Sequence, residues 1–234
     1  PDGRLFLHLD LYRLVKQDAA ALVERAVVEG DIVVIEWADR LADLPPPPRI
    51  LLSLRDDGVR GVHTAELHYE DWPIPSEHTI AAWRTAVALP RNVASHSDTV
   101  ARVTDTLAND FHRRRLAVRS RALHAAARAH DLLRMMDFKE NAGHTTQPVS
   151  PQDRHLWQSL RVTYAGLGHE EACAAFLAER GFNEIGDIVR THGVRGTPPV
   201  TTEQRLLYYA DKRVMQDSIV TIEERFWDFS KRYG

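Results

Sequence analysis

The alanine-rich segment 123–134 constrains the fold most, because it ends in an adjacent imidazole and carboxylate, His130 and Asp131. Helical spacing places His130 on the same side as Leu123 and Ala127. Burying a polar group without a partner costs about 2 kcal/mol or more, so the pair predicts a partner in the core. For one isolated pair, a hydrogen-bonded core histidine is a commoner arrangement than a metal ligand.

Further polar side chains lie on the apolar faces of other predicted helices. His96 is in register with Val100, and Asp211 ends a run of Leu-Leu-Tyr-Tyr-Ala-Asp that should be packed. His169 and His192 also follow helical spacing with apolar neighbours. Six polar groups on five apolar faces indicate one common site.

Four imidazoles and two carboxylates form a ligand set that iron, manganese or zinc accepts. Structural zinc sites usually recruit thiolates, but the single cysteine, Cys173, is in register with Phe176 and is predicted to be a buried, inert thiol. Asp131 lies directly beside a candidate ligand and is placed to bridge two ions. The residues therefore predict a divalent transition-metal site that is built from histidines and carboxylates and is not a structural zinc site.

The order of these ligands resembles that of the HD-domain metal-dependent phosphohydrolase superfamily, over about residues 76–234. Its pattern, with the two extra histidines of two-metal members, is matched by His96, His130, Asp131, His169, His192 and Asp211. The resemblance implies an all-α helical bundle and two metal ions bridged by Asp131. It also implies an enzyme that hydrolyses a small anionic phosphoester, such as a nucleotide.

Basic residues near these ligands predict how the phosphate is bound. Arg134 lies four residues after His130, on the same predicted helix face, and its guanidinium can bind two phosphate oxygens. Many family members have lysine there; because arginine stays protonated, we expect Arg134 to take part in catalysis by binding charge and not by donating a proton. Lys212 and Arg213 adjoin the last ligand and are further candidates for substrate binding.

Residues 1–75 predict a small, strand-rich α/β unit before the helices, so the chain as a whole is expected to be α+β. The predicted elements are a strand over 4–12, a helix over 17–29, a buried strand over 31–35, and a hairpin of strands 49–55 and 59–69 that turns at 56–58. The boundary is expected near Pro75, and strands are expected to be absent after it. Ser76, Ser150 and Thr201 are predicted to cap helices.

Two segments of this first unit, 8–13 and 35–40, resemble the TsaE family, a small P-loop ATPase of threonylcarbamoyladenosine modification of tRNA. The resemblance implies that Asp10 and Glu36 lie near Mg-ATP, and that partners are proteins of tRNA modification. It covers only the carboxyl-terminal half of that fold, and the sequence has no G-x-x-x-x-G-K-[ST] loop. Without that loop we expect a strand-rich remnant that packs against the helical part.

Two alternatives to phosphohydrolysis stay open. Some HD-domain proteins use a di-iron pair to activate oxygen and cleave a carbon–carbon or carbon–phosphorus bond, and the six ligands do not separate the two chemistries. In the second alternative, the helical part has no catalytic activity and is a partner module of a tRNA-modification ATPase. An exposed loop position is expected for His144, in the segment 138–149.

Composition limits the partners. Hydrophobic residues make up 44% and charged residues 27%, which is ordinary for a soluble globular protein. Residues 1–75 have 8 Lys/Arg against 14 Asp/Glu, a net −6, and the rest have 22 against 19, a net +3, so duplex nucleic acid is not an expected partner. Without a signal peptide or membrane-spanning run, we expect a cytoplasmic protein. Its start at Pro1 indicates a fragment or a processed product.

Overall fold

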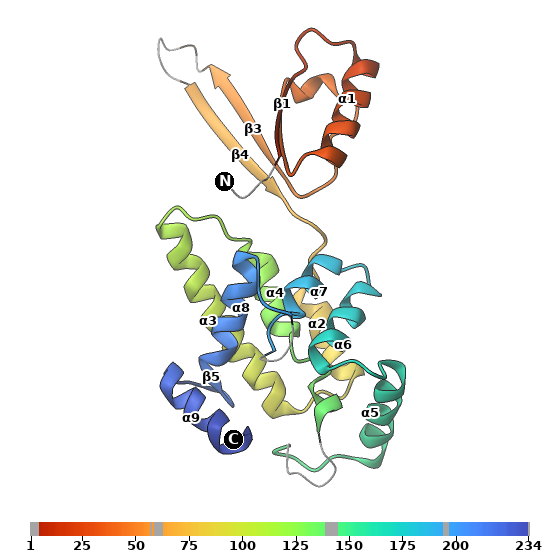
Figure 1. Ribbon diagram of the computed structural model, residues 1–234, viewed down its shortest axis with the longest axis vertical. Helices are drawn as coiled ribbons and strands as arrows, with labels where there is room; N and C mark the ends of the chain where they lie inside the picture. The colour runs from red at the N-terminus through yellow and green to blue at the C-terminus, as the bar shows by residue number, and fades with distance from the viewer. Residues whose placement is uncertain (1–4, 57, 59–62, 139–144, 194–196, 234) are drawn as a thin grey trace. The chain divides into compact units, whose positions relative to one another are not determined.

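The computed structural model describes residues 5–56, 58, 63–138, 145–193 and 197–233 (Figure 1). The chain divides into two compact units, residues 1–72 and 73–234. It is mixed in class, with helices and small two-stranded sheets. Within the described residues, no helix is both long and apolar enough to cross a membrane.

The first unit contains the predicted strands and helix. They are β1 (Phe6–Asp10), α1 (Lys16–Glu29), β2 (Ile32–Glu36), the short 3-10 helix η1 (Ala38–Arg40), β3 (Arg49–Asp56) and β4 (His63–Glu70). Strands β1 and β2 are parallel, with Asp10 opposite Glu36, and β3 pairs antiparallel with β4. Leu11, Ala19 and Val23 form a small core.

The prediction that the second strand is buried is wrong for one of its faces. Ile35 packs against the small core, whereas Ile32 and Val34 are 46% and 41% exposed. The reason is that the alternating side chains of a strand point to opposite sides of the sheet, and the core with α1 covers only one side. A continuous run of β-branched residues does not reveal this difference.

The second unit is built around α4 (Ser120–Ala129), whose residues are mostly buried. Its alanines have small side chains, so α3 (Arg91–Arg113), α7 (Asn183–Val189) and α8 (Thr202–Lys212) pack closely around it (Figure 1). The other helices are α2 (Glu77–Ala86), the 3-10 helix η2 (Arg134–Asp137), α5 (Pro151–Thr163), α6 (His169–Ala178) and α9 (Ile222–Tyr233).

The predicted caps are confirmed. The side chains of Ser76, Ser150 and Thr201 each accept a hydrogen bond from the backbone N–H three residues later. Thr201 and Gln204 form the reciprocal capping box. These local signals set where α2, α5 and α8 begin.

The prediction that strands are absent after residue 75 is wrong at one place. Two short strands, β5 (Val214–Met215) and β6 (Ser218–Ile219), form an antiparallel hairpin between α8 and α9. Its turn holds Gln216 at φ 57°, a left-handed conformation for which the sequence offers no glycine or asparagine. The usual turn signal is therefore missing, and only the structure reveals the hairpin.

Candidate metal centre

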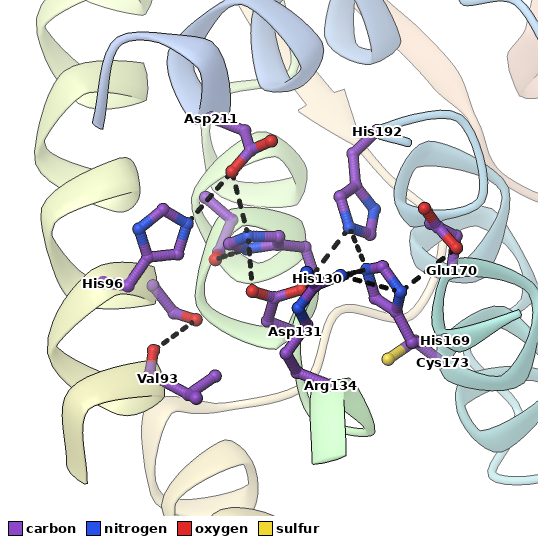
Figure 2. Close-up of polar contacts among 12 residues, drawn as sticks. Val93, His96, His130, Asp131, Arg134, His169, Glu170, Cys173, His192 and Asp211 are labelled. Atoms are coloured by element: carbon purple, nitrogen blue, oxygen red, sulfur yellow. Dashed lines mark hydrogen bonds and ion pairs between the residues drawn. The ribbon is translucent and has the colours of Figure 1, made fainter. Parts of the chain in front are cut away.

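The structure brings all six predicted ligands together in the second unit, from five separate segments (Figure 2). His96 comes from the second turn of α3, and Asp211 from the last turn of α8. The other four are His130 and Asp131 just after α4, His169 at the start of α6, and His192 just after α7. Each of the six side chains is largely buried.

Two of the helices from whose spacing these residues were predicted end earlier than expected. Helix α4 ends at Ala129, and the chain turns before Arg134 begins η2. His130 and Arg134 therefore do not share a helix face, and the prediction that they do is wrong. Helix α7 likewise ends at Val189, before His192. Helix ends and turns let these side chains leave the apolar faces and point to one centre.

Three of the histidine rings are oriented by backbone carbonyls. In each, the Nδ1 atom donates to a carbonyl oxygen, and because a carbonyl only accepts, this fixes the tautomer. The pairs are His96 with Gln216 at 2.9 Å, His130 with Ala127 at 2.7 Å, and His192 with Val189 at 2.7 Å. A neutral ring held in this way keeps the lone pair of Nε2 for a metal ion.

The fourth ring, His169, is oriented by a carboxylate instead. Its Nδ1 lies 2.5 Å from Oδ2 of Asp137, and Oε2 of Glu170 is 3.2 Å away. A ligating histidine that donates its other N–H to a carboxylate is a recurrent arrangement in metalloproteins. The sequence pattern predicted no role for either acid; their only signal in the sequence is their place, with Asp137 three residues after Arg134 and Glu170 directly beside His169.

The two oxygens of Asp131 face different histidines. Oδ2 lies 3.7 Å from Nε2 of His130, whereas Oδ1 lies 3.3 Å from Nε2 of His169 and 3.5 Å from Nε2 of His192. Two groups of candidate ligands result, each with its ligand atoms within 4.8 Å of one another, and Asp131 belongs to both. This is the geometry of a bridging carboxylate.

Asp211 completes the first group. Its Oδ1 lies 3.0 Å from Nε2 of His96 and 3.7 Å from Nε2 of His130 (Figure 2). The Nε2 atom of His130 is fully buried and has no hydrogen-bond partner. Because buried polar atoms are almost always satisfied, this atom fits a metal ligand better than a core hydrogen-bonding group.

The charges of the site also suit a cation. Burial raises the pKa of Asp131, but the neighbouring imidazoles of His130, His169 and His192 and the charge of Arg134 together outweigh it and hold the pKa well below its usual range. Burial likewise raises the pKa of Asp211, but the charge of Lys212 and the contacts with His130 and His96 together outweigh it, so this pKa is also well below its usual range. Both carboxylates are therefore ionised and can bind a divalent ion.

Burial acts on the rings as well. It lowers the pKa of His169, but hydrogen bonds to Asp131 and Asp137 outweigh it and raise that pKa to about 9. For His192 burial prevails, and its pKa is lowered. His169 therefore carries the proton that a bound metal ion has to displace.

Lys212 lies inside the cluster and forms hydrogen bonds to two of its residues. It is buried, and its Nζ donates to Oδ2 of Asp211 at 2.6 Å and to the carbonyl oxygen of His192 at 2.9 Å. It leaves Oδ1 of Asp211 to face the histidines. The structure thus uses Lys212 to position one candidate ligand from each group.

The two arginines predicted to bind substrate differ in position. Nη1 of Arg134 lies 3.0 Å from both ring nitrogens of His169 and 3.2 Å from Asp137. Arg213 instead donates to the carbonyl of Val220 and the hydroxyl of Tyr209. Among the described residues that line the cavity beside the cluster, Arg134 is present and Arg213 is not.

This cavity has a volume of about 1030 Å³, large enough for a nucleotide-sized ligand. Five of the candidate ligands line it, as do Lys212 and the cationic side chains of Arg91, Arg134 and Arg225. The lining also contains carboxylates outside the ligand set, Asp137, Glu170 and Asp217. The described part of the second unit therefore joins a buried His/Asp cluster to a cavity lined by both cationic and acidic side chains.

Comparison with known proteins gives no match. No protein-family model, no curated protein and no solved structure is similar to the chain. What the structure establishes is a buried cluster of histidines and aspartates, among them His130, Asp131, His169 and His192, that is able to hold a metal ion.

Asp10 and Glu36, the predicted nucleotide-site residues, belong to the first unit. They lie at the ends of neighbouring parallel strands. Oε1 of Glu36 is 2.9 Å from Nε2 of His8, and Asp10 accepts a hydrogen bond from the backbone N–H of Tyr12. His144 lies outside the described residues.

Proposed function

We propose that the second unit is a metal-dependent phosphohydrolase of the HD type, with two divalent transition-metal ions. The observation that carries the proposal is the position of Asp131, with one oxygen toward the Nε2 atom of His130, which has no hydrogen-bond partner, and the other toward His169 and His192. Its ionised state and burial favour binding between two cations. Iron, manganese and zinc all accept this donor set.

Each ion would be held by its own group of residues. His96, His130, Asp131 and Asp211 suit one ion, and Asp131, His169 and His192 suit the other. When bound, such ions lower the pKa of a coordinated water and stabilise charge on a phosphoryl oxygen. Asp137 would keep Nε2 of His169 directed at the ion, because it holds the other ring nitrogen.

The remaining side chains support a phosphoester as the substrate. Arg134 lies at the cluster and lines the cavity, where its guanidinium can bind phosphate oxygens and hold the ester in place. Arg91 adds a second positive charge to the lining. Lys212, whose Nζ is buried and already donates to Asp211 and the His192 carbonyl, would position ligands and not contact substrate.

The test combines metal analysis with a panel of phosphoesters, assayed in air and under anaerobic conditions. We expect about two metal ions per chain and release of inorganic phosphate that does not need oxygen. Asp131→Asn should abolish both, whereas Asp217→Asn, a cavity-lining carboxylate outside the ligand set, should keep both. Strict dependence on oxygen would favour the di-iron oxygenase, and protein without metal would overturn both.

A further inference from the structure

The last helix, α9, brings aromatic side chains to a cavity that is otherwise mostly polar. Among the described lining residues, the large apolar ones are Val93, Phe138, Phe226 and Phe229. Phe226 and Phe229 both come from α9, and their rings meet edge to face with centroids 6.0 Å apart. Binding a metal or a phosphate does not need aromatic surface, so these rings suit another part of the ligand.

The Phe226 ring is available for such a contact. It is 54% exposed, and it is not among the described side chains that pack in the hydrophobic core. Its neighbour Trp227 is 61% exposed but does not line the cavity, and Lys231 lies over its ring. The two adjacent aromatic residues therefore differ in one respect that matters here, their access to the cavity.

Arg225 adds a polar group to the same wall. Its side chain is mostly buried, pairs with Asp228 at 3.3 Å, and lies 4.4 Å from the centre of the Phe229 ring. Its Nε is buried and has no hydrogen-bond partner. Arg84 and Arg128 also have such an atom, but neither lines the cavity. Because Arg225 itself lines the cavity, its guanidinium can donate to an acceptor on a bound ligand.

We propose that α9 determines substrate specificity by selecting phosphoesters that carry a flat heteroaromatic ring. The ring would stack on Phe226 and Phe229, and the guanidinium of Arg225, which lines the cavity, would donate to an acceptor on it. The inference rests on the proposed function, which puts the phosphate beside Arg134. Stacking on one aromatic side chain strengthens binding about tenfold, and every flat base can use it.

Calorimetric titration of the metal-loaded full chain tests this. The probes are the methylenephosphonate analogues of adenosine monophosphate and of ribose 5-phosphate, in which CH2 replaces the ester oxygen and prevents hydrolysis. We expect the adenosine compound to bind about tenfold more tightly. Phe226→Ala should remove most of that difference without weakening the ribose compound, and Phe226→Trp should restore it. Trp227→Ala is the matched control and should leave both affinities unchanged.

Equal binding of the two compounds, or a difference that survives both Phe226→Ala and Phe229→Ala, would overturn the role of α9. The readout is separate from phosphate release, which tests the proposed function. Ring-dependent binding without hydrolysis would support α9 as a ring-binding wall and refute the phosphohydrolase. Hydrolysis of both parent esters, with the same kcat/KM in the wild type and in Phe226→Ala, would support the phosphohydrolase and refute the role of α9 in specificity.

Discussion

Each unit of the protein contains a histidine–carboxylate contact of nearly the same length. In the first unit, His8 and Glu36 are 2.9 Å apart and their side chains are 51% and 56% exposed. In the second, His96 and Asp211 are 3.0 Å apart but only 12% and 10% exposed. Contact length therefore does not separate a surface pair from a candidate metal ligand pair. Burial does, because a buried group has no water to replace a missing partner.

The largest effect that this comparison predicts is on Asp131. Asp131→Ala should remove most bound metal and lower the free energy of unfolding by about 4 kcal/mol, because four rings would stay buried without their ion or carboxylate. Metal analysis and chemical denaturation measure both quantities. Asp10→Ala, in the first unit, is the control and should change neither. Unchanged metal content and stability in Asp131→Ala would refute the site.

The next effect concerns Lys212, a buried lysine. Among its described residues, the first unit has no buried lysine. Lys212→Met keeps most of the side-chain volume but leaves the buried carboxylate of Asp211 without its cation. We expect a loss of about 3 kcal/mol in denaturant unfolding and weaker metal binding. Lys231→Met, at an exposed position on α9, should cost less than about 0.5 kcal/mol. Equal stabilities of the two variants would show that Lys212 does not position Asp211.

Removal of the metal should affect the two units differently. A ligand present at 100 times its Kd stabilises the folded state by about 2.7 kcal/mol, so a chelator should destabilise the second unit by about that amount. Hydrogen exchange measured by mass spectrometry should become faster in α4, α6 and α8 and stay the same in α1. Readdition of the ion should restore protection. Equal changes in both units would contradict the assignment of the ligands to the second unit alone.

The smallest effects are expected in the first unit. Because the His8–Glu36 pair is exposed, Glu36→Gln should change stability by less than about 0.5 kcal/mol. A P-loop binds phosphates through backbone amides and a lysine, and carboxylates at strand ends cannot replace it. We therefore expect Mg-ATP to bind this unit with a Kd above about 1 mM. Titration of Asp131→Asn with a nonhydrolysable analogue measures it, and micromolar binding lost in Asp10→Ala would make this unit an ATP site.

Residue types and spacing were enough to predict much of this molecule. Apolar alternation predicted β1, two strand-like segments with a turn signal between them predicted the hairpin of β3 and β4, and capping residues predicted where α2, α5 and α8 begin. These features are local, since a cap or a strand face depends on residues a few positions apart. The same kind of pattern selected the six candidate ligands, because a polar group on an apolar face needs a partner wherever the chain folds.

Only the tertiary structure decided how those ligands meet. Which oxygen of Asp131 faces which ring depends on α4, α6 and α7 packing together, and the His96 tautomer depends on Gln216, 120 residues away. The acids around His169, the burial of Lys212 and the β5–β6 hairpin follow from the same long-range packing. Sequence periodicity reports which side of an element is apolar. It does not report where that element ends or what lies opposite, because both are set by contacts between distant segments.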